Sequence, residues 1–256
     1  MPDWTSWGEY VSFIDSDDYI SSDLYEKNIE ILQKDKTIDI LQFPMVFVEG
    51  ERQTPAEFPE FVPGTHMCDK KDFFQFWGSG GTGVRGFVWQ NIYRKELWDG
   101  LRFERMYFED CEIQSRLLEK VHHVYVSGHG AYYYVQREGS ILHSRGSAQK
   151  SQDDFRSTIP FIERMAAHGV ERALVVKCYL LTANRLLDKS YLFTAAPFKA
   201  SYARLNRIGV SVGEILAYKG LPKHKIKVLF CRLIGLDNFN RLQAAITKIT
   251  GRHVTA

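Results

Sequence analysis

Three aspartates in one short run are the side chains of this sequence best suited to binding a metal ion. Asp15, Asp17 and Asp18 directly follow a short apolar run at residues 10–14. Side chains alternate along an extended chain, so Asp15 and Asp17 point to the same side and both can approach one hard cation such as Mg²⁺ or Mn²⁺. The alternative is that these aspartates cap a helix or form a turn, since Asp is common in both roles.

A second acidic pair stands in the middle of the chain. Glu109 and Asp110 begin the segment 109–120, whose pattern predicts a helix. The helix dipole favours negative charge in the first turn, so we expect Asp110 to be ionised and able to accept a proton. The alternative is that both residues are ordinary first-turn acids.

A mixed α/β unit is expected to position these acids. The run at 10–14 ends abruptly in polar residues, as a buried strand does where it leaves a sheet, and ligands bind at that end of the strands in open α/β sheets. A helix with Ser22 as its N-cap should follow, and then a strand over 38–48 in which Pro44 marks an edge position or a bulge. Further extended segments are predicted at 87–93, 121–126 and 131–135.

The segment 49–86 has no clear periodicity. It is rich in Pro, Phe and Gly and ends in the glycine-rich run 78–83. That run lacks the spacing of a phosphate-binding loop, so we interpret the segment as a mobile loop that covers an acceptor.

The chain after residue 150 reads as almost wholly helical. Ser211 and Glu214 have the spacing of a capping box, and Pro222 suits the first position of the next helix. We therefore divide the chain into a mixed α/β segment, 1–150, and a helical segment, 151–256. The first carries 16 Lys and Arg against 24 Asp and Glu, a net charge of −8, whereas the second carries 17 against 7, a net charge of +10.

Composition narrows the class of protein. The hydrophobic content of 45% and the charged content of 25% are typical of globular proteins, which argues against a disordered chain. Four scattered cysteines form no CxxC pair, so neither a disulfide framework nor a zinc site is expected from their spacing, and a reducing cytoplasm fits best. No stretch approaches the roughly 20 apolar residues that a membrane-spanning helix needs.

Four segments in order resemble glycosyltransferase family 2. Residues 8–18, GEYVSFIDSDD, are similar to the family's stretch around its Asp-x-Asp motif. Residues 87–97, FVWQNIYRKEL, resemble its Trp-containing segment, and Leu101-Arg102-Phe103 with residues 107–112, YFEDCE, resemble its Phe followed by a Glu-Asp pair. Residues 132–141, YYYVQREGSI, are similar to its closing element. Together these segments cover about residues 8–145.

The resemblance implies a GT-A (Rossmann-like) fold and an inverting transfer of a sugar, of hexosyltransferase type, from a nucleotide-sugar donor, for which a UDP-sugar is expected. It implies that Asp15 contacts the nucleotide or the metal and that Asp17 binds the Mn²⁺ or Mg²⁺ that bridges the sugar diphosphate. Asp110 would be the general base, Glu109 would orient it, and Arg137 would contact the diphosphate. His143 follows the closing element and is a further candidate metal ligand, since neutral imidazole binds metals, with an ordinary surface histidine as the alternative.

One part of the family pattern is expected to be missing. Family members normally begin with a half that holds the nucleotide base and ribose, and this sequence starts a few residues before the Asp-x-Asp strand. We therefore expect an N-terminally truncated fold, weak or no binding of a nucleotide sugar, and self-association through the exposed edge of strand 10–14. The alternative to an active transferase is an inactive remnant or a subunit that depends on a partner.

The expected partners are the nucleotide sugar and a glycan or lipid-linked acceptor of surface polysaccharide synthesis, with no nucleic acid. The basic helix from Pro222 carries an apolar stripe, which consists of Ile226, Leu229, Phe230, Leu233 and Ile234. The stripe either packs on the other helices, which we favour, or docks on a protein or on a membrane surface. A cytoplasmic protein, peripheral to the inner face of the membrane if that stripe binds lipid, is the resulting expectation.

Overall fold

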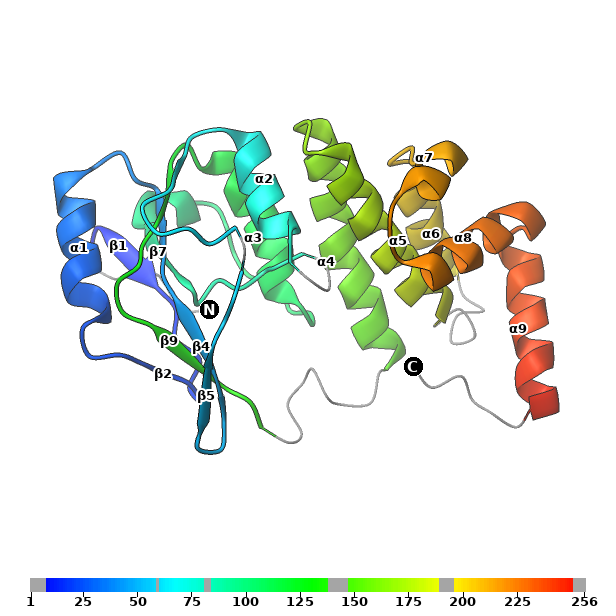
Figure 1. Cartoon of the computed structure of the whole chain (residues 1–256), viewed down its shortest axis with the longest axis horizontal. Coiled ribbons are helices and arrows are strands. Elements are labelled where there is room, and N and C mark those ends of the chain that lie inside the picture. The colour runs from blue at the N-terminus through cyan, green and yellow to red at the C-terminus, as the bar shows by residue number, and fades with distance from the viewer. Residues whose placement is uncertain (1–7, 59, 81–83, 138–146, 189–195, 251–256) are drawn as a thin grey trace.

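The computed structural model describes residues 8–58, 60–80, 84–137, 147–188 and 196–250. Two β-sheets and α1 lie at one end of the molecule, the helices α4 to α9 lie at the other, and α2 and α3 lie between them (Figure 1). The protein is therefore mixed α/β with a helical C-terminal region, as the sequence predicts.

The larger sheet has five strands in the order β1-β7-β3-β8-β6. Strand β7 is antiparallel to both β1 and β3, β3 is parallel to β8, and β6 is antiparallel to β8. Hence β1, β3 and β8 all run in one direction, and β1 lies at the end of the strand order, where the sequence predicts an edge. The bounds are β1 (Tyr10–Ser12), β3 (Ile40–Gln42), β6 (His66–Met67), β7 (Asn91–Arg94) and β8 (Val124–Val126).

The smaller sheet has the order β2-β9-β4-β5. Its strands are β2 (Tyr19–Ile20), β4 (Met45–Glu49), β5 (Arg52–Pro55) and β9 (Tyr132–Val135). The single strand predicted over 38–48 is wrong, because β3 and β4 belong to different sheets and the chain crosses between them at Pro44. Proline has no N–H to continue a ladder, and the Pro44 carbonyl instead accepts a hydrogen bond from the N–H of Tyr132 (2.9 Å). Strands β8 and β9 likewise belong to different sheets: β8 to the larger and β9 to the smaller.

Two helices correct details of the sequence prediction. The segment 49–86, predicted to be a loop, contains α2 (Lys70–Gly78), which begins where the Asp69 side chain accepts a hydrogen bond from the N–H of Lys71. Phe73, Phe74 and Trp77 lie on its buried face. Helix α1 (Leu24–Lys34) begins after Asp23 rather than after Ser22.

One apolar core joins the two predicted segments of the chain. It contains side chains of the larger sheet, of α2 and α3 (Glu109–Lys120), and of α4 (Ala148–Ala167) and α5 (Arg172–Asp188). Phe74 of α2 meets Phe161 of α4 edge to face, with ring centroids 5.2 Å apart. Helix α4 runs across the predicted boundary at residue 150, so the helical region and the sheet share their packing.

The remaining helices are one short helix of the sheet region and four helices of the C-terminal region. They are η1 (Lys95–Trp98), a 3₁₀-helix of the sheet region, and α6 (Ala196–Asn206), α7 (Val212–Ala217), α8 (Pro222–Ile234) and α9 (Leu236–Thr250). Ser211 and Glu214 form the predicted capping box at the start of α7, and Pro222 begins α8. Within the described ranges, no helix combines the length and the apolar character needed to cross a membrane.

The apolar stripe of α8 packs only partly as expected. Val228 and Cys231 are the buried residues of this helix, whereas Ile226 is 69% and Leu233 is 82% exposed, and Phe230 is also exposed. The expectation that the stripe packs on neighbouring helices is wrong for Ile226 and Leu233. It is confirmed for Leu229 and Ile234, which pack against the core, and the ring of Phe230 contacts that of Phe239 in α9 (centroids 6.2 Å apart).

Candidate active site

Strand direction brings the two acidic groups to one edge of the larger sheet. Asp15 follows the carboxyl end of β1, and β8, which runs in the same direction as β1, ends at the same edge. Helix α3 returns into β8 after only three residues, so its N-terminus, with Glu109 and Asp110, lies toward that edge. The negative charges of both Glu109 and Asp110 interact with Asp15.

Tyr132 of β9 stabilises the turn formed by residues 15–18, the aspartate turn. Its hydroxyl accepts a hydrogen bond from the N–H of Asp15 (3.0 Å) and donates one to the carboxylate of Asp18 (2.8 Å). The other Asp18 oxygen accepts from the N–H of Val135 (2.8 Å), and the N–H of Asp18 donates to the Asp15 carbonyl (3.1 Å). Asp18 is therefore a structural residue of the turn, which leaves Asp15 and Asp17 as the candidate ligands.

The predicted diphosphate contact lies beside this turn. The guanidinium of Arg137 donates a hydrogen bond to the main-chain carbonyl of Asp17 (2.9 Å). Asp17 and Arg137 are both exposed. A cationic group and two carboxylates thus stand together at an open surface, as a site for a metal-bound anion requires.

The carboxylates of the aspartate turn repel one another. Partial burial and the negative charges of Asp18, Asp17 and Glu109 raise the pKa of Asp15, although its side chain still reaches solvent. Like charges held close together favour protonation, and a bound cation would remove that penalty.

Asp110 has the most perturbed carboxyl group of the site. Burial, followed by the charges of Glu109 and Asp15, raises its pKa to about 7 even though the N–H of Val88 donates to it (3.4 Å). Desolvation therefore outweighs the helix dipole, so that Asp110 is only partly ionised near neutral pH. A carboxyl that titrates near neutral pH has the proton affinity required of a general base.

The first turn of α3 is held by close backbone contacts. Phe108, the residue before the helix, has a left-handed conformation (φ 60°, ψ 33°), which costs of order 1–3 kcal/mol for a bulky residue. Gly86 lies against the other side of this turn, where an added Cβ would come within 2.4 Å of the Cα of Cys111. Only glycine therefore lets residues 86–88 approach Asp110 closely enough for the Val88 hydrogen bond.

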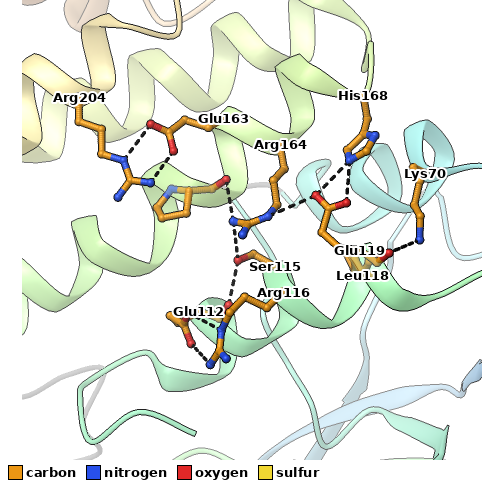
Figure 2. Close-up of polar contacts among 11 residues, drawn as sticks. Lys70, Glu112, Ser115, Arg116, Leu118, Glu119, Glu163, Arg164, His168 and Arg204 are labelled. Atoms are coloured by element: carbon orange, nitrogen blue, oxygen red, sulfur yellow. Dashed lines mark hydrogen bonds and ion pairs between the residues drawn. The ribbon is translucent and has the colours of Figure 1, made fainter. Parts of the chain in front are cut away.

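A hydrogen bond and ion pairs link α3 to α4 (Figure 2). Arg164 of α4 donates to the Ser115 hydroxyl (3.2 Å) and pairs with Glu119 (3.3 Å). His168 Nε2 lies 3.0 Å from both carboxylate oxygens of the same Glu119. These contacts are partly exposed and each is worth little, so they add to the apolar packing that holds α3, the helix that carries Asp110, against α4.

A stack of aromatic rings adjoins the aspartate turn through Tyr132. Trp89 lies face to face with Tyr132 (centroids 4.3 Å apart), Tyr134 (5.5 Å) and Phe87 (4.8 Å). Burial and the charges of Asp18, Asp15 and Asp17 raise the pKa of Tyr134, which places its hydroxyl near the aspartate turn. The two-residue spacing of Tyr132 and Tyr134 on a strand puts both rings on one face.

The donor atoms of the turn suit the expected metal. Carboxylate oxygens are the ligands of Mg²⁺ and Mn²⁺, and Mg²⁺ is commonly held by one or two carboxylates together with substrate phosphates and water. Asp15 and Asp17 fit that pattern. His143, the third predicted ligand, lies outside the described residues.

Comparisons with known proteins add no relative. A search with models of protein families found no match to this chain, and a search of curated proteins found no similar sequence.

Proposed function

We propose that this protein is an inverting glycosyltransferase of the family 2 type, with a GT-A (Rossmann-like) fold, that uses a nucleotide sugar, a UDP-sugar in the first instance, as donor. The observation that carries the proposal is the meeting of Asp110, with its pKa of about 7, and the Asp15–Asp17 turn at the carboxyl ends of the strands. The order of the four resembling segments supports the family, and the mixed sheet is compatible with it.

In this proposal Asp110 acts as the general base. Its carboxylate takes the proton of an acceptor hydroxyl as that oxygen attacks the anomeric carbon, and the bond to the donor diphosphate breaks on the opposite face. Glu109 raises the proton affinity of Asp110 through its charge, and the N–H of Val88 orients one of the carboxylate oxygens. Since the base must be ionised, transfer should increase with pH and level off above about pH 7.

The aspartate turn and Arg137 serve the departing diphosphate. Asp15 and Asp17 would hold Mn²⁺ or Mg²⁺, which neutralises charge on the leaving group when it is bound. Arg137, anchored on the Asp17 carbonyl, stands ready to contact a phosphate oxygen. Glycan or lipid-linked acceptors of surface polysaccharide synthesis are the proposed substrates, in the cytoplasm.

Donor turnover tests this function. The protein is screened with a panel of nucleotide sugars and Mn²⁺ for release of the nucleoside diphosphate, and Asp110→Asn and Asp17→Asn serve as variants. Loss of a positioned base should reduce transfer by about 10²–10⁴-fold, while donor binding survives in Asp110→Asn and weakens in Asp17→Asn. Full activity of Asp110→Asn would remove the base assignment, and failure of every donor would favour the inactive or partner-dependent alternative.

A second proposed role, peripheral membrane contact, rests on α8 and α9. These helices enclose an open apolar groove of about 410 Å³, lined by Lys223, Ile226, Lys227, Phe230, Phe239, Leu242, Gln243 and Ile246. Lys227 pairs with Asp188, and Lys225 donates to the carbonyls of Leu216 and Tyr218, so part of the basic charge is already engaged within the protein. Flotation with anionic vesicles tests this role: binding should weaken in Ile226→Ser with Leu233→Ser, and no binding of the unmodified protein at low salt would exclude it.

A further inference from the structure

A cluster of nitrogen and oxygen donors lies at the opposite end of the larger sheet from the acids. Asp35 follows α1 and precedes β3, His66 opens β6, and His123 immediately precedes β8. These positions are at the amino ends of β3 and β8, whereas Asp15 lies at the carboxyl end of β1. The ligand atoms of the three side chains all lie within 4.8 Å of one another. In the described part of the chain, this is the one group of three or more His, Cys, Asp or Glu that comes so close.

We propose that Asp35, His66 and His123 bind a divalent transition-metal ion of the Zn²⁺ class. Two imidazoles and a carboxylate form a three-ligand set of the kind that Zn²⁺ accepts, with water in the fourth position. Nitrogen donors favour such ions over Mg²⁺ and Ca²⁺. This site is independent of the proposed sugar transfer and uses none of its residues.

Hydrogen bonds set the protonation of the imidazoles. Thr37 donates its hydroxyl proton to Asp35 Oδ1 (2.5 Å), so its oxygen is an acceptor for His123 Nδ1 (2.8 Å). That bond places the proton of His123 on Nδ1 and leaves a lone pair on Nε2. The same Nε2 faces His66 Nδ1 at 2.8 Å. A histidine ligand whose other ring N–H is held by a hydrogen-bond acceptor, as Thr37 holds His123, is common in metal sites.

Metal binding by the two imidazoles requires a proton shift within His66 and a small separation of the rings. His66 donates the proton between the two rings in the metal-free protein, and a shift of its own proton from Nδ1 to Nε2 exposes a second lone pair without net proton release. Two nitrogens on a tetrahedral ion with bonds of 2.0–2.1 Å lie about 3.3 Å apart, so the rings must separate by about 0.5 Å. His66 is exposed and can move by that amount, while the main-chain N–H of His123 donates a hydrogen bond to the Asp39 carboxylate (3.2 Å).

A bound metal ion is expected to stabilise the edge of the larger sheet formed by β6. Strand β6 has two residues and pairs with β8 through His66–Tyr125 and Met67–Val124. A metal that links His66 to His123 and Asp35 joins this edge to β8 and to the segment before β3. An ion in 100-fold excess over its Kd should raise the thermal midpoint by roughly 5–10 °C.

Calorimetric titration of metal-stripped protein with Zn²⁺ tests the site. We expect one ion per chain, no competition from millimolar Mg²⁺, and at least about 100-fold weaker binding in His66→Ala, since loss of a second-shell partner alone costs about 10–100-fold. Thr37→Val should weaken Zn²⁺ binding by about 10–100-fold, because the hydrogen bond that orients His123 is lost.

Matched variants decide where the ion binds. His122→Ala replaces the neighbouring exposed histidine, whose side chain is not one of the three ligands, and should bind Zn²⁺ like the unmodified protein. The double variant Asp15→Asn with Asp17→Asn should also retain binding. No uptake of Zn²⁺, equal affinity of His66→Ala, or loss of binding in the Asp15 and Asp17 variant alone would each overturn the proposal.

Discussion

The two ends of the larger sheet differ in how they treat a carboxylate. At the carboxyl end, Asp110 is buried beside other acids and its pKa is raised to about 7. At the amino end, the hydroxyl and the N–H of Thr37 lower the pKa of Asp35, with smaller contributions from His123 and His66. The first arrangement opposes ionisation and is eased by a proton or a cation, whereas the second already satisfies its charge. The ionised carboxylate of Asp110 therefore lowers the stability of the fold, whereas the ionised carboxylate of Asp35 raises it.

The same contrast separates the two candidate metals. Asp15 and Asp17 offer oxygens on an open turn, which fits a hard ion that shares its ligands with a substrate. His66 and His123 offer ring nitrogens, which fits a transition-metal ion of the Zn²⁺ class. A metal effect on activity therefore needs variants at both ends before it is assigned to either.

The largest expected effect is a gain in stability when the buried charge of Asp110 is removed. A carboxyl whose pKa is raised by folding costs stability that begins above its unfolded value of 3.8 and levels off above its folded value of about 7. Asp110→Asn should therefore be more stable at pH 8 by up to about 4 kcal/mol and within about 1 kcal/mol at pH 4. Denaturant unfolding at the two pH values measures this, and equal stability of the two proteins at pH 8 would contradict the raised pKa.

Gly86→Ala should have the next largest effect. The new Cβ would collide with the Cα of Cys111 (2.4 Å), so residues 86–88 must move away from α3 at a cost of about 1–3 kcal/mol. The same movement would lengthen the Val88 hydrogen bond to Asp110 and raise the pH at which activity reaches its plateau. Unfolding and the pH profile of transfer measure both effects.

Gly213→Ala is the matched control for that change. Gly213 lies in α7, where the nearest atom to an added Cβ is Ser211 Oγ at 3.9 Å. Alanine has the higher helix propensity, so this substitution should be neutral or slightly stabilising. A loss of stability as large as that of Gly86→Ala would show that the effect does not come from the contact with α3.

The sequence predicts the acids of the carboxyl edge better than their surroundings. The helix at 109–120 and the strand before Asp15 follow from local pattern, so their direction and the meeting of their ends can be anticipated. The role of Tyr132 cannot, because its hydroxyl bridges Asp15 and Asp18 across more than 110 residues. The pKa of Asp110 is equally non-local, since it depends on burial beneath residues 86–88.

The candidate metal site at the amino end of the larger sheet cannot be predicted from the sequence, because its residues are also brought together by tertiary contacts. Asp35, His66 and His123 come from three separate segments with no metal-binding spacing, and the region around His66 was expected to be a loop. Strand β6 becomes visible only through its pairing with β8. Helix α2 was missed although Asp69 supplies an N-cap and aromatic residues recur at helical spacing, because the surrounding Pro and Gly obscured the signal.

Asp35→Asn should have the smallest effect and the opposite dependence on pH. A carboxyl whose pKa is lowered by folding contributes stability above its unfolded value of 3.8, and that contribution is lost as the pH falls through the lower folded pKa. The variant should therefore be slightly less stable than the unmodified protein at pH 7 and equal to it in strong acid. Asp110→Asn, in contrast, should become more stable than the unmodified protein as the pH rises from 3.8 to about 7. Thermal unfolding across pH 3–8 for both variants measures the two profiles side by side. Parallel profiles would mean that the two ends of the sheet do not treat their carboxylates differently, whereas profiles of opposite sign would sharpen the contrast between a satisfied carboxylate and one that awaits a proton or a cation.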